Sequence, residues 1–78
     1  MTIESLLDKY KNNLPKGYDL VGVDGNAFSV IGYVQSAMRS EKWAQDDISF
    51  VINTMMSSDY NNLLSVATQI IYANKEDL

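Results

Sequence analysis

The residues best suited to bind a ligand lie in the segment GVDGNAFSVIGY, residues 22–33. Two glycines, an Asp and an Asn come directly before an apolar stretch with helical spacing. Backbone N–H groups at the start of a helix attract phosphate or carboxylate groups, and glycine lets a ligand approach the backbone closely. The segment therefore predicts a binding loop made of Asp24, Gly25, Asn26 and Ala27.

A purely local interpretation of the same segment competes with ligand binding. Either Asp24 caps the helix, or Asp-Gly forms a turn that Asn26 caps, and Phe28 then begins the core face. The loop contains no Lys or Arg, and Asp24 brings its own negative charge. The spacing also differs from that of the known phosphate-binding motifs. The local interpretation is favoured, and ligand binding stays open beside it.

Aromatic residues and one arginine complete the candidate ligand site. If the ligand is a nucleotide, we expect Tyr18, Tyr33 or Trp43 to stack on its base and Arg39 to face a phosphate. Tyr33 and Tyr72 lie outside the main apolar stripes of their predicted helices, which is typical of interface residues. Trp43 lies on a polar link, where it either covers the core or forms an exposed anchor. Arg39 is also explained by its place near a helix C-terminus.

Catalytic chemistry is not expected from this composition. The chain contains no Cys and no His, which removes the commonest metal ligands and the commonest general base. A calcium loop starting at Asp19 would need oxygen ligands where Val21 and Val23 stand. No residue pattern resembles a nucleophile with its base. We therefore predict no enzyme activity, no catalytic residue, no metal site and no cofactor.

Size and charge limit the kind of partner. The chain has 78 residues, 46% of them hydrophobic, and a formal net charge of -4, which indicates one globular domain spanning residues 1–78. The negative charge opposes direct DNA or RNA binding and docking on anionic membranes. The sequence shows neither a signal peptide nor an apolar run long enough for a membrane span, so we expect a cytoplasmic protein. Because so short a chain builds only a small core, we also expect a homo-oligomer.

The elements that must position these residues are helices, so the predicted fold class is all-α, a small bundle of about four short helices. Apolar spacing predicts an N-terminal helix over residues 3–13 with Thr2 as N-cap, a loop over 14–25, a helical core over 26–73 and a polar tail over 74–78. Residues 18–23, YDLVGV, are expected to form one short extended segment or a strand.

Within the helical core, the spacing predicts three helices. They cover about residues 26–39, about 46–57, and a last one that carries the apolar residues from Tyr60 to Ile71. Asp46 and Asp47 suit the positive end of the middle helix dipole. Ser57 or Ser58 is expected to cap the last helix, with Asp59 in its first turn. Met55 and Met56 are expected to fill the core.

The segments DGNAFSVIGYVQSAMR and SSDYNNLL resemble a family of small uncharacterised proteins of tailed phages and prophages. That family carries a DGNAF segment, an amphipathic helix with an internal Gly, and a DY-x-x-LL segment, and the resemblance covers roughly residues 20–71. Here Ser57-Ser58 stands where a Ser-Gly pair is typical, and Asn61-Asn62 where acidic or His residues often occur. The resemblance implies a phage origin and, by analogy with other small phage proteins, a binding function that counters host defence.

Two functions follow from these features. The first is sequestration of a nucleotide-type immune signal between the subunits of an oligomer. The alternative is an acidic inhibitor that binds a host defence protein, with Asp and Glu side chains in place of nucleic-acid phosphates. A helix-turn-helix regulator is less expected, because the predicted helices lack the basic residues that a recognition helix needs.

Overall fold

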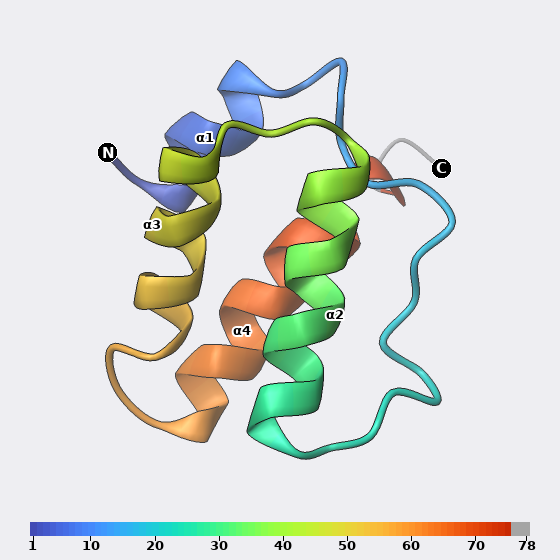
Figure 1. Cartoon of the computed structure of the whole chain (residues 1–78), viewed down its shortest axis with the longest axis vertical. Helices are drawn as coiled ribbons and strands as arrows, with labels where there is room; N and C mark the ends of the chain where they lie inside the picture. The colour runs from blue at the N-terminus through green and yellow to red at the C-terminus, as the bar shows by residue number, and fades with distance from the viewer. Residues whose placement is uncertain (76–78) are drawn as a thin grey trace.

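The computed structural model describes residues 1–75 of the chain. Three longer helices, α2 (Ala27–Ser40), α3 (Gln45–Met55) and α4 (Tyr60–Ile71), pack against one another. A short helix, α1 (Ile3–Lys9), lies across the end of the bundle where α3 begins, and a short 3-10 helix, η1 (Ala73–Lys75), follows α4 (Figure 1). The all-α bundle predicted from the sequence is confirmed. None of the helices in residues 1–75 has the length and apolar character that crossing a membrane requires.

The bundle closes around one hydrophobic core to which all four α-helices contribute. The predicted inward positions of α2, α3 and α4 are largely confirmed, and Trp43 joins them from the α2–α3 link. The core residues are Ile3, Leu6, Val30, Val34, Ala37, Met38, Trp43, Ile48, Val51, Met55, Leu63, Val66, Ala67, Ile70 and Ile71.

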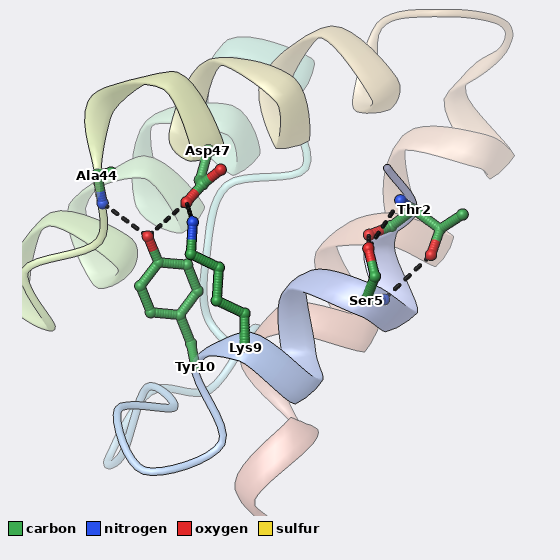
Figure 2. Close-up of polar contacts among 6 residues, drawn as sticks. All are labelled: Thr2, Ser5, Lys9, Tyr10, Ala44 and Asp47. Atoms are coloured by element: carbon green, nitrogen blue, oxygen red, sulfur yellow. Dashed lines mark hydrogen bonds and ion pairs between the residues drawn. The ribbon is translucent and has the colours of Figure 1, made fainter.

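The first helix is shorter than the predicted 3–13, because it ends at Lys9 with Tyr10 as its C-cap. Turns follow Tyr10, and Asn13 donates a backbone hydrogen bond to the Tyr10 carbonyl. Thr2 caps the helix as predicted, and Ser5 completes a reciprocal capping box, which Figure 2 shows. A helix of seven residues is marginal alone, so this box and packing on the bundle stabilise it.

The N-cap of α4 lies just after the predicted one, which was Ser57 or Ser58. Asp59 itself is the N-cap, and its Oδ1 accepts a hydrogen bond from the Asn62 backbone at 2.9 Å. Ser57 and Ser58 instead belong to the turn between α3 and α4. Asp, Ser and Asn are about equally favourable at the N-cap position. The register of the core face therefore decides which of them caps the helix.

The end of α2 explains why Trp43 lies inside. Lys42 adopts a left-handed conformation with φ of 66°, the Lys42 N–H donates to Arg39 O, and the Trp43 N–H donates to Met38 O. These are the two hydrogen bonds of a Schellman motif, which usually places a glycine where Lys42 stands. The motif reverses the chain and directs the Trp43 side chain into the core, where it is 5% exposed. Of the two alternatives predicted for Trp43, a side chain that covers the core and an exposed anchor, the first is therefore correct.

Residues 18–23 form no strand in the described part of the chain. A turn with a hydrogen bond from Val23 N to Leu20 O replaces it. Two tyrosine hydroxyls hold this turn, one from α2 and one from the C-cap of α4. The Asp19 N–H donates to Tyr33 Oη at 2.9 Å, and the Leu20 N–H donates to Tyr72 Oη at 3.0 Å. Tyr33 and Tyr72, which lie off the apolar stripes of their helices, therefore accept the hydrogen bonds that a neighbouring strand would otherwise accept from residues 19 and 20.

Candidate functional site

The DGNAF segment caps α2 as the local interpretation predicts. Asn26 is the N-cap of α2, and its Oδ1 accepts a hydrogen bond from Phe28 N at 2.8 Å. Asp24 Oδ1 accepts one from Asn26 N at 2.9 Å. The backbone donors of Asn26 and Phe28 are thus engaged within the loop itself. Of the three amides predicted to contact a phosphate, those of Gly25 to Ala27, the Asn26 amide is therefore already bonded within the loop.

Tyr60 joins the two segments that carry the family resemblance. Its hydroxyl donates a hydrogen bond to the carbonyl oxygen of Gly25, although the two residues lie 35 positions apart. The start of α2, the end of α3 and the start of α4 consequently meet at one end of the bundle, the lower end in Figure 1. Sequence reasoning placed Tyr60 on the core face, yet it is 42% exposed.

Large apolar side chains are exposed at this same end. Phe28 is 81% exposed and Met56 is 53% exposed, although both were predicted to belong to the core. Those two predictions are wrong. Phe28 lies two positions from the buried Val30 and therefore on the side of α2 turned away from the core, and Met56 lies just beyond the last turn of α3. We call this end of the bundle the DGNAF end and define it by residues at or near the helix ends that meet there, Asp24, Phe28, Met56, Asp59 and Tyr60.

The other predicted ligand residues do not converge on the DGNAF end. Arg39 lies in the last turn of α2, roughly 20 Å along the helix axis from Asn26 at about 1.5 Å per residue. Trp43 is buried near that same far end, where its Nε1 donates to Asn13 O at 2.9 Å. One copy of the chain therefore brings Asp24, Gly25, Asn26 and Ala27 together but leaves Arg39 and Trp43 apart from them.

Tyr18 and Tyr33 are also engaged within the chain. Their rings pack edge to face with centroids 5.7 Å apart, and the Tyr33 hydroxyl accepts the Asp19 amide. Beside them the Tyr72 hydroxyl donates to Asp19 Oδ1 at 2.6 Å. That bond to a carboxylate raises the pKa of Tyr72 above its ordinary value of 10.0. These rings hold the loop that leads to the DGNAF end, so the predicted stacking on a base gains no support.

A second polar cluster lies at the opposite end of the bundle. The Asp47 carboxylate, 3% exposed, accepts hydrogen bonds from Lys9 Nζ at 2.7 Å and from the Tyr10 hydroxyl at 2.5 Å (Figure 2). The Tyr10 hydroxyl in turn accepts the Ala44 amide, and its ring stacks on Trp43. The Lys9 and Tyr10 hydrogen bonds lower the pKa of Asp47 below 3.8. Every polar group in this cluster has a structural partner, so the cluster joins α1 to α3 and does not resemble a reactive centre.

Neither the groove beside α1 nor the acidic side chains add to the predicted site. An open groove of about 380 Å³ lies between α1 and the C-terminal segment, lined by Glu4, Leu7, Asp8, Lys11, Leu14 and Ala73. It includes none of the predicted site residues. Within the described residues, no three acidic side chains gather in a way that would hold a metal ion.

The charges are distributed unevenly between the two ends. Five cationic residues, Lys9, Lys11, Lys16, Arg39 and Lys42, belong to α1, the loop after it and the last turn of α2 with its link to α3. Residues 17–38 and 43–74 contain no Lys or Arg at all. The DGNAF end therefore carries two carboxylates, those of Asp24 and Asp59, and no cation.

Comparisons with known proteins leave the family of this chain undetermined. A scan against protein-family models, a search of curated proteins and a search of solved structures each found no match. The resemblance to small phage proteins therefore stays a prediction.

Proposed function

We propose that this protein is a small binding protein that acts by contacting another protein through the DGNAF end. The observation that carries the proposal is the exposure of Phe28, an aromatic side chain that is 81% accessible in a chain of only 78 residues. Burying a Phe side chain stabilises a fold by about 1.5–3 kcal/mol. A domain this small is only marginally stable, so leaving the ring exposed forgoes a large contribution. An aromatic ring that stays exposed to this extent is typical of a binding surface.

The phage origin suggested by the sequence gives this proposal a biological setting. A phage protein that binds and does not catalyse would act by covering a host protein, and a host defence protein is the target we propose. The alternative proposed from the sequence, sequestration of a nucleotide signal, needs a second copy of the chain to complete its site. It stays a prediction, because no contact within one copy supports it.

Affinity capture from a bacterial lysate tests the proposal. We expect the wild-type chain to retain at least one specific protein, and Phe28→Ala to retain about tenfold less of it, as for a central interface residue. Val21→Ala is the matched control, because Val21 is 85% exposed on the loop between α1 and α2 and lies outside the DGNAF end. Mass spectrometry quantifies the retained proteins. If every retained protein is equally abundant with Phe28→Ala and wild type, the DGNAF end is not the binding surface.

A further inference from the structure

Residues 1–16, which we call the N-terminal strap, cover one end of a bundle whose core is nearly complete without them (Figure 1). Helices α2, α3 and α4 each pack against the other two. All residues of the hydrophobic core except Ile3 and Leu6 lie in residues 30–71. Pro15 is the one further buried residue of the strap. The three longer helices therefore keep most of their core when the strap leaves the bundle.

The polar contacts of the strap are ones that water can replace. The Tyr10 hydroxyl donates to Asp47 Oδ2 and accepts the Ala44 amide at 2.9 Å, as Figure 2 shows. Trp43 Nε1 donates to Asn13 O at 2.9 Å. Because one partner of each bond lies on the strap, departure of the whole strap opens both partners to solvent. No polar group is then left buried and unpaired, which is the costly way to break a hydrogen bond.

The chain on the other side of Gly17 is anchored independently of the strap. The Tyr18 ring packs edge to face on Tyr33, and the Asp19 N–H donates to the Tyr33 hydroxyl. Lys16 and Gly17 lie between the two anchored parts and are both exposed. Gly17 has φ of 79°, and glycine rotates about its backbone more freely than any other residue. These two residues are therefore suited to act as a hinge.

The helix of the strap depends on its contact with the bundle. It has seven residues, and so short a helix is marginal in water without packing. Detachment and melting of α1 should consequently occur together. The conformational entropy that the strap gains offsets part of the lost contacts, so detachment should require less free energy than unfolding of the whole chain.

We infer that the N-terminal strap detaches from the bundle as one cooperative unit, turning about Lys16 and Gly17, while α2, α3 and α4 stay folded. In this open state the Trp43 indole and the Asp47 carboxylate, both buried in the closed molecule, reach the surface. The strap is thus a cover built into the fold. It lies at the end of the bundle opposite the DGNAF end, and the inference does not depend on the proposed function.

Native-state hydrogen exchange of the full chain, followed by NMR, tests the inference. The Leu6 and Tyr10 amides are bonded within the strap, and the Trp43 indole N–H is bonded to it. We expect these three groups to have protection factors within about threefold of one another and about tenfold or more below that of the Ile70 amide in α4. Their exchange should also depend less steeply on urea, because detachment exposes only part of the buried surface.

Two variants separate detachment from global unfolding. Val30→Ala removes core volume in α2 at the DGNAF end, from packing that the closed and open states share. It should speed exchange of the Ile70 amide about tenfold or more and leave the Trp43 indole within about twofold. Tyr10→Phe keeps the ring that stacks on Trp43 but removes a hydroxyl that is bonded only in the closed state. It should speed exchange of both groups alike, by about three- to tenfold.

Three results would overturn the inference. Equal protection of the Leu6, Tyr10, Trp43 and Ile70 groups would mean that the strap leaves only when the whole chain unfolds. Low protection of the two strap amides beside a Trp43 indole as protected as Ile70 would mean that α1 frays in place. Equal acceleration of the Trp43 indole and the Ile70 amide by Val30→Ala would also assign both to global unfolding. The wild-type comparison decides by itself if a variant does not fold.

Discussion

Asp47 is a carboxylate that the fold buries, and its hydrogen bonds to two residues of the N-terminal segment hold that segment in place. Lys9 is 56% exposed in its side chain, whereas the Asp47 side chain is 4% exposed. Water and salt therefore screen the ion pair on the lysine side, while the Tyr10–Asp47 hydrogen bond is better protected. Tyr10 consequently contributes more than Lys9 to the stability of the fold.

Replacement of Asp47 should destabilise the fold more than replacement of Lys9. We expect Asp47→Ala to cost about 1–3 kcal/mol of unfolding free energy, because it leaves the Tyr10 hydroxyl without its acceptor. Lys9→Ala should give a smaller shift in the same direction. Urea denaturation measures both, with constant slopes as the control for two-state behaviour. Equal shifts in the two variants would contradict the assignment of the stronger contact to Tyr10.

The pH dependence of stability has a definite sign at Asp47. Because folding lowers its pKa, the unfolded chain binds a proton more readily, and the carboxylate stabilises the fold fully above its ordinary pKa of 3.8. This contribution is lost as the pH falls through the lower pKa of the folded state. We expect the difference in urea midpoint between wild type and Asp47→Asn to be constant near neutral pH and to shrink below pH 3.8. A difference that grows on acidification would exclude this linkage.

At the scale of elements, α2 combines a well-formed helix with one position that weakens it. Gly32→Ala should raise stability by about 0.5–1 kcal/mol, and the melting temperature by several degrees, because the added methyl group meets open space. Gly22→Ala is the contrasting variant: Gly22 has φ of 89°, so alanine there is strained and the melting temperature should fall. Calorimetry measures both. A lower melting temperature for Gly32→Ala would show that α2 is packed at that position.

At the scale of the whole molecule, the oligomeric state separates the two functions expected from the sequence. The core is closed within one copy, and the described residues leave no buried side-chain polar atom without a hydrogen-bond partner. A chain that reserves the DGNAF end for another protein should therefore be a monomer of 8.8 kDa by light scattering. A ring or larger assembly would instead favour the nucleotide-sequestering function, which needs a site between subunits.

The amino-acid sequence by itself determined the fold class and most of the core. Apolar residues at helical spacing predicted α2, α3 and α4, and Thr2 and Asn26 were recognisable as caps, because helix periodicity and capping depend on residues within one or two turns. The local explanation of the DGNAF segment was recognisable for the same reason. These features need no knowledge of which helix lies beside which.

Only the tertiary structure decided what the helix ends expose and which distant residues meet. Tyr60 lies three positions before the buried Leu63 and so follows the apolar rhythm of α4, yet it is 42% exposed in the first turn. Phe28 lies off the stripe of buried α2 residues that begins at Val30, and it is 81% exposed. The contact of Asp47 with Lys9 spans 38 positions, and that of Tyr72 with Leu20 spans 52. Such contacts depend on how helices pack against one another, which local patterns do not encode.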